Sequence, residues 1–117
     1  MNKETEQRPQ LNEAWVMKAL DYLQSTDEQY GDLKGRVKAL EYRMKVAKAM
    51  SFLETEGKGT IAEREAMSLV SDEYRHKIDE LENTAVELET ISAKRKRAEL
   101  TIEVWRSQNA NRRQGNI

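Results

Sequence analysis

The chain has 117 residues and a net charge of −1, with 35% charged and 38% hydrophobic residues. This length allows one domain, and such a composition, with one proline and few aromatic residues, is typical of long helices and coiled coils. The absence of cysteine excludes disulfides and thiolate metal sites, and the single histidine, His76, has no companion imidazole and is interpreted as a surface residue.

The first part of the chain is predicted to be a polar lead-in followed by two helices. Residues 1–11 lack helical periodicity, so we expect a disordered lead-in that is too polar for a signal peptide. Asn12 is a suitable N-cap for a first helix over about residues 12–25, and Asp27 for a second over about 27–55.

The clearest break in the sequence is the segment around Lys58, which two glycines, Gly57 and Gly59, enclose. A phosphate-binding loop needs a lysine followed directly by serine or threonine, a spaced earlier glycine and a preceding strand. These features are absent here, so the segment is interpreted as a turn between two helices.

A very long third helix is predicted over about residues 60–113, because this stretch has neither proline nor glycine and carries an apolar stripe at helical spacing. Thr60 and Glu63 form a capping box at its start. Ser71 begins a second N-cap sequence, so a break near residue 71 is the alternative. Residues 114–117 are predicted to be a flexible tail.

Together these elements predict an all-α fold: an elongated three-helix hairpin or coiled-coil-like bundle within a single helical domain over residues 12–113. The second helix is expected to pair antiparallel with the first half of the third, and the first helix to pack back across this hairpin. The remaining stripe would then lack a partner within the chain and would form an oligomer interface. Its residues are Ile91, Ala98, Ile102 and Trp105.

Basic residues are concentrated in two blocks, residues 34–53 and 90–117, that alternate with acidic segments. Positive side chains of this kind neutralise nucleic-acid phosphates. The C-terminal block also contains Asn, Gln and Trp105, residue types that contact phosphates and stack on bases. The alternative is that the first block pairs with the acidic face of the third helix. The candidate nucleic-acid-binding residues are Lys34, Lys38, Arg43, Lys45, Lys48, Lys58, Lys94, Arg95, Lys96, Arg97, Arg106, Arg112 and Arg113.

No pattern in the sequence indicates catalysis. There is no Gly-x-Ser-x-Gly motif, and the carboxylates are scattered over helix faces that we expect to be solvated. No run approaches the roughly 18 apolar residues of a membrane span. We therefore expect a soluble, intracellular, non-enzymatic protein with no catalytic residue, metal, cofactor, membrane contact or small-molecule substrate.

The layout resembles the UvsY-type phage recombination mediators. The resemblance covers about residues 12–105 and rests on the short first helix, the segment Lys45-Val46-Ala47-Lys48-Ala49, the turn Gly57-Lys58-Gly59, the segment Ala62-Glu63-Arg64-Glu65-Ala66 and the long closing helix. Members of that family are small helical proteins that form ring oligomers and bind single-stranded DNA. They help to load a RecA-like recombinase in place of single-strand-binding protein.

The resemblance implies that Lys45, Lys48 and Lys58 contact DNA, and that the protein is cytoplasmic, in the host cytoplasm if a phage encodes it. The shorter length and the Arg- and Asn-rich tail depart from the family pattern. The resulting hypothesis is a homo-oligomeric recombination mediator that binds single-stranded DNA. The alternative is a structural or adaptor coiled coil, such as a phage assembly or regulatory protein, whose basic blocks serve subunit pairing. A regulator of duplex DNA is a third hypothesis, but the sequence lacks a helix-turn-helix signature.

Overall fold

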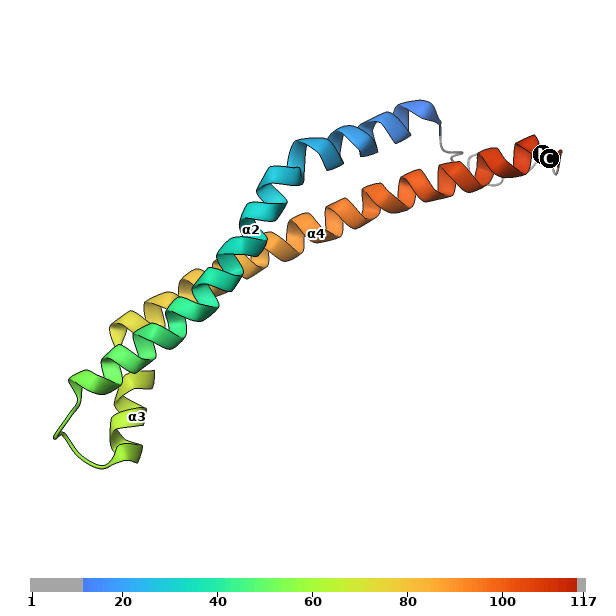
Figure 1. Cartoon of the computed structure of the whole chain (residues 1–117). Helices are drawn as coiled ribbons and strands as arrows, with labels where there is room; N and C mark the ends of the chain where they lie inside the picture. The colour runs from blue at the N-terminus through green and yellow to red at the C-terminus, as the bar shows by residue number, and fades with distance from the viewer. Residues whose placement is uncertain (1–11, 116–117) are drawn as a thin grey trace, which may run out of the picture. The chain divides into compact units, whose positions relative to one another are not determined.

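The computed structural model describes residues 12–115, which form the helices α2 (Glu13–Glu54), α3 (Ile61–Leu69) and α4 (Asp72–Arg113) (Figure 1). This part of the chain contains no strand. The predicted all-α fold with a very long C-terminal helix is confirmed. The predicted lead-in lies outside the described residues, as do the last two residues of the predicted tail.

Helix α2 continues through residues 25–27, so the prediction of two separate helices there is wrong. The hydroxyls of Ser25 and Thr26 donate hydrogen bonds to the carbonyl oxygen of Tyr22 at 3.1 and 2.7 Å. Such bonds engage side chains that would otherwise cap a new helix. Asp27 binds Arg95 through its carboxylate at 2.8 Å instead of capping a helix. Three residues of N-cap type are thus accommodated inside one helix.

The turn between α2 and α3 contains two glycines with positive φ, Gly57 at 79° and Gly59 at 134°. L-residues with a side chain rarely adopt such angles, which explains why glycine stands at both positions. Of the predicted capping box, the structure has the bond between the Glu63 amide and the Thr60 side chain. The Glu63 amide donates to the Thr60 hydroxyl at 3.1 Å, and this hydroxyl lies 3.2 Å from the Glu63 carboxylate. The predicted helix-to-helix turn is confirmed.

The long third helix is interrupted at residues 70 and 71, as the alternative reading of Ser71 predicts. The Ser71 hydroxyl accepts a hydrogen bond from the Tyr74 amide at 3.4 Å and donates one to the Ser68 carbonyl at 2.8 Å. One side chain therefore caps the start of α4 and binds the end of α3.

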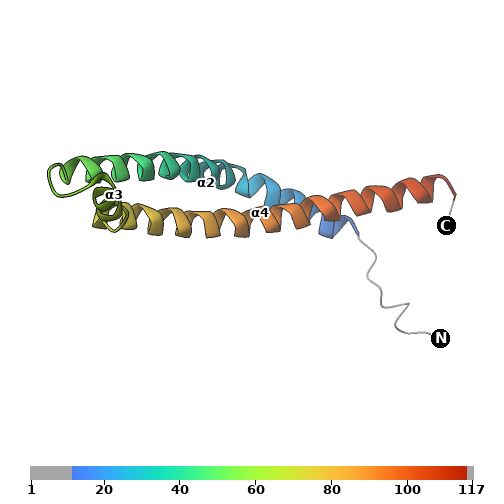
Figure 2. The ribbon, with the colours of Figure 1, turned by 90° about the horizontal axis from the view of Figure 1, so that it is seen from below.

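The helices form two compact units, and both α2 and α4 contribute to each. Unit 1 comprises Met1–Glu28 and Ile91–Ile117, and unit 2 comprises Gln29–Thr90. In each unit a segment of α2 runs antiparallel to a segment of α4 (Figures 1 and 2). Buried and half-buried residues of α2 recur at alternating intervals of three and four, the spacing of a coiled-coil seam.

The seams contain small and polar residues as well as aliphatic ones. In unit 1 the buried residues are Val16, Ala19, Thr26, Ile91 and Ala98. In unit 2 they are Leu33, Leu40, Ala47, Ser51 and Ser68. Short side chains allow the backbones of two helices to approach closely, which favours a narrow contact over a large apolar core.

In unit 2, α3 closes the turn end of the helix pair through polar contacts. Ser68 is 0% exposed, and the Ser51 hydroxyl donates to that of Ser71 at 2.9 Å. The last turn of α2 has no basic residue, and Arg64 of α3 supplies the positive charge there. Its guanidinium donates to the Phe52 carbonyl at 3.1 Å and to the Thr55 hydroxyl at 3.2 Å, and it lies 4.1 Å from the Phe52 ring centroid. Arg64 therefore stabilises the C-terminal end of the α2 dipole.

The apolar stripe predicted to lack a partner is partly covered within unit 1. Ile91 is 6% exposed and Ala98 is 8% exposed, so the expectation that these two residues have no partner within the chain is wrong. The physical reason is the continuity of α2, whose first turns lie in the same unit as this part of α4. Ile102 and Trp105 are half-buried.

Candidate nucleic-acid interface

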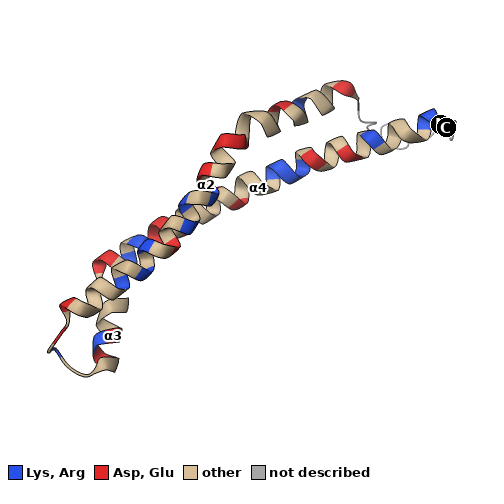
Figure 3. Ribbon diagram, viewed as in Figure 1, with Lys and Arg blue, Asp and Glu red and all other residues tan. Residues whose placement is uncertain are grey.

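Four lysines of unit 2 lie on one face of α2. Lys34, Lys38, Lys45 and Lys48 are all exposed, and their spacing of four, seven and three residues repeats every one or two helical turns. We call these four residues the lysine stripe; lysines and arginines of α2 are both blue in Figure 3. Glu41 lies on the same face of α2, so this face carries four positive charges and one negative charge.

The lysine stripe is not neutralised by the acidic segment of α4. Among residues 12–115 no ion pair joins a stripe lysine to a carboxylate. The Lys34 ammonium instead lies 5.1 Å from the centroid of the Tyr30 ring. In α4, Glu80 pairs with the neighbouring Lys77 at 3.2 Å and with His76 at 3.3 Å. Ion pairs with the acidic residues of α4 therefore do not explain the lysine stripe.

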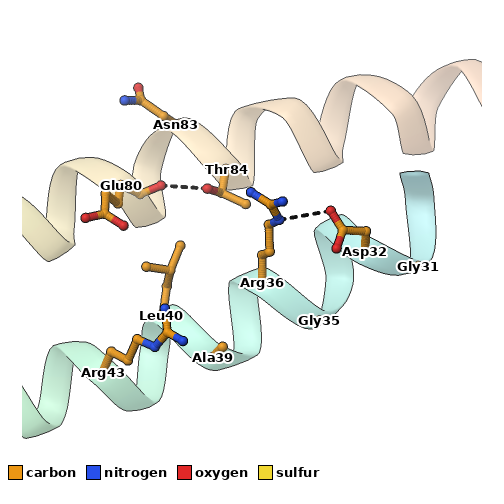
Figure 4. A pocket seen from close by; sticks show the side chains of 10 residues that line it. All are labelled: Gly31, Asp32, Gly35, Arg36, Ala39, Leu40, Arg43, Glu80, Asn83 and Thr84. Carbon is orange, nitrogen blue, oxygen red and sulfur yellow. Dashed lines mark hydrogen bonds and ion pairs between the residues drawn. The ribbon is translucent and has the colours of Figure 1, made fainter. Parts of the chain in front are cut away.

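Arg43 does not belong to the lysine stripe. It lies half a turn away from the stripe around α2 and lines a different hollow of unit 2, together with Arg36 and Glu80 (Figure 4). Arg36 forms an ion pair with Asp32 at 2.9 Å in this hollow. Positive and negative side chains are thus balanced there, and Arg43 is a weaker candidate for phosphate binding than the stripe.

The structure brings Lys45 and Lys48 together at the junction of α2 with α3. Both line a hollow of about 390 Å³ whose other lining residues include Leu53 and Glu65. Lys58 is exposed in the turn, where its amide donates to the Thr55 carbonyl at 2.9 Å. Lys58 is not among the residues that line the hollow.

The C-terminal basic block of α4 divides into exposed residues and one inward residue. The exposed members are Lys94, Lys96, Arg97, Arg106, Arg112 and Arg113; lysines and arginines of α4 are blue in Figure 3, with red acidic residues between them. The Arg95 side chain is only 14% exposed. Its guanidinium donates to the Leu23 carbonyl at 2.8 Å, the Thr26 hydroxyl at 2.7 Å and the Asp27 carboxylate at 2.8 Å. Arg95 therefore holds α4 to α2 within unit 1, and we remove it from the candidate interface.

Arg95 was predicted to bind nucleic acid because of its charge, but its position in the sequence indicates its contact with α2. It follows Ile91 by four residues and precedes Ala98 by three, so it stands on the seam of α4. Thr26 stands on the seam of α2 in the same way. The capping role of Arg64 was also missed, and the sequence signal for it was the absence of a basic residue in the last turn of α2.

Comparisons with protein-family models, with curated proteins and with solved structures give no match to this chain. Within the described residues, no helix has both the length and the apolar character required to cross a membrane. The same residues contain no group of three or more acidic, histidine or cysteine side chains that could hold a metal ion.

Proposed function

We propose that this chain binds single-stranded nucleic acid through the lysine stripe of α2, Lys58 and the exposed basic residues of α4. The observation that carries the proposal is that the stripe is exposed and that no described carboxylate forms an ion pair with it. Lysine ammonium groups bind phosphates as point charges, independently of base sequence. A protein of this kind would bind a strand through its phosphates, whatever the base sequence.

Aromatic side chains beside the lysines support a single strand over a duplex. Tyr30 contacts Lys34, and Tyr42 is exposed within one turn of Lys38 and Lys45. Unpaired bases stack on exposed aromatic rings, whereas the bases of a duplex are already stacked on one another.

The role of recombination mediator remains a proposal that rests on the resemblance to the UvsY-type family. It implies a homo-oligomer and, as partners, a RecA-like recombinase and single-strand-binding protein. Because Ile91 and Ala98 are covered in unit 1, self-association would use Ile102, Trp105 or other apolar side chains.

A structural or adaptor protein is the second candidate function. Large apolar side chains are exposed at the turn end of unit 2, among them Leu53, Ile61 and Val70. Exposed large apolar side chains are found at surfaces that contact other proteins. This observation supports a protein partner or a second copy of the chain, and it is compatible with strand binding elsewhere on the molecule.

A titration of the intact chain with labelled single-stranded and duplex oligonucleotides of equal length, at two salt concentrations, tests the proposal. We expect tighter binding to the single strand and a steep loss of affinity with salt, because each neutralised phosphate contributes about 0.7 to the log-log slope. Absence of binding at low salt, or affinity that does not change with salt, would replace the proposal by the adaptor function.

A further inference from the structure

Unit 1 contains an open groove of about 590 Å³ between the first turns of α2 and the basic part of α4. Its floor includes Ala19 and Ala98, which are both buried. Because an alanine side chain ends at Cβ, the seam is filled only by methyl groups here, which leaves room above it. All the residues that line the groove belong to unit 1.

The α2 wall of the groove consists of two aromatic side chains with a lysine between them. Trp15 is 38% exposed and Tyr22 is half-buried, and Lys18 is exposed. Trp15 and Tyr22 are seven residues apart, which places them two turns, or about 10.5 Å, apart along the helix. Their rings are therefore separate platforms on the same side of α2.

The α4 wall adds positive charge. Lys94 and Arg97 line the groove and are exposed, whereas Arg95 between them turns inward to Leu23 and Thr26. The contacts of Arg95 fix the register of α4 against α2 in this unit. That register places Lys94 and Arg97 opposite the aromatic wall.

The groove thus combines two aromatic rings with three cations, and no acidic residue lines it. Aromatic rings stack on planar bases, and lysine and arginine bind the phosphates between them. From this arrangement we infer that the groove is a base-stacking subsite for single-stranded nucleic acid, in which Trp15 and Tyr22 stack on bases while Lys94 and Arg97 bind the adjacent phosphates. The inference rests on the proposed function and adds a second, base-dependent site to the phosphate contacts of the lysine stripe.

Fluorescence gives a direct test, because the chain has only two tryptophans. In a Trp105→Phe background Trp15 is the sole tryptophan. We would titrate this protein with oligothymidylate and with an abasic oligodeoxynucleotide of equal length, which has the same phosphates but no bases. We expect oligothymidylate to quench Trp15 and to bind more tightly, and the abasic strand to bind without quenching.

Two variants and a matched control separate stacking from folding. Trp15→Ala and Tyr22→Leu should each weaken oligothymidylate binding by about five- to hundredfold and leave the abasic strand almost unaffected. Leu20→Ala removes an exposed apolar side chain from the opposite face of the same segment and should change neither affinity. Trp15→Phe keeps an aromatic ring and should retain most of the affinity, even if Trp15→Ala unfolds the unit.

The possible failures are distinguishable. If the intact chain binds neither strand, the proposed function fails and the subsite with it. If both strands bind equally, and Trp15→Ala and Tyr22→Leu fold but leave oligothymidylate affinity unchanged, the groove is no subsite, but phosphate binding elsewhere stands. If oligoglutamate quenches Trp15 and competes with oligothymidylate on equal terms, the groove binds acidic polypeptides and the inference is overturned.

Discussion

A partly buried arginine joins the helices of unit 1, whereas serine hydroxyls join helices of unit 2. In unit 1, Arg95 donates to a carbonyl, a hydroxyl and a carboxylate of α2. In unit 2, Ser51, Ser68 and Ser71 connect α2 with the α3–α4 junction, and the lysines of α2 stay exposed. Position on the seam therefore decides whether a basic residue holds helices together or remains available to a ligand.

The largest effect is expected from Arg95→Ala, which removes three hydrogen bonds made by a charged group. Such bonds contribute about 1.5–3 kcal/mol, so we expect a loss of that order in the free energy of unfolding, measured by urea denaturation. The exposed neighbour is the matched control: Lys96→Ala should change stability by less than about 0.5 kcal/mol. Hydrogen exchange should rise in residues 13–28 and 91–113 and stay unchanged in 29–90. Equal effects of the two substitutions would show that Arg95 does not hold unit 1 together.

Ser68→Leu is expected to act on the other unit. Ser68 has no exposed surface, so a larger side chain must displace its neighbours, at a cost of about 1–3 kcal/mol. Ser68→Ala keeps the small volume and should cost less than about 1 kcal/mol. Here hydrogen exchange should rise within residues 29–90. A rise confined to unit 1 would contradict the assignment of α3 to unit 2.

The smallest effects come from glycines of unit 2. A Cβ at Gly31 would meet nothing within 4 Å, so Gly31→Ala should stabilise the helix by about 0.5–1 kcal/mol. At Gly59 the φ is +134° and a Cβ would lie 2.7 Å from a Glu63 carboxylate oxygen. Gly59→Ala should therefore destabilise by about 1 kcal/mol or more. Thermal melts of the two variants should shift in opposite directions, and shifts of the same sign would refute the different roles assigned to these glycines.

Much of the fold could be predicted from the sequence because its strongest signals are local. The turn was predicted from the glycines around Lys58 and from Thr60 and Glu63. The break before α4 was indicated by Ser71. The error at residues 25–27 arose because Ser, Thr and Asp can cap a helix or bond within one. The choice depends on the partner Arg95, which lies far away in the sequence.

The candidate site was less predictable than the fold. Helical spacing alone was sufficient to place Lys34, Lys38, Lys45 and Lys48 on one face. The inward position of Arg95 depends on the pairing of α2 with α4, which helical spacing does not predict. The positions of Lys94 and Arg97 at the groove of unit 1 depend on the same pairing.

The central claim is that exposed lysines of unit 2 bind the phosphates of a single strand. The most direct test replaces Lys45, Lys48 and Lys58 together by Ala and compares salt-dependent affinities for single-stranded oligonucleotides, with light scattering as a check on oligomer size. Lysine-to-arginine replacement at the same three positions keeps the charge and is the matched control.

We expect the alanine variant to bind all sequences more weakly, with a log-log slope flattened by about 2 for each set of three lost contacts. Oligomer size should stay the same, and the arginine variant should behave as the parent. If the alanine variant dissociates while its affinity per subunit and its slope are unchanged, these lysines serve subunit pairing, and the adaptor function replaces strand binding.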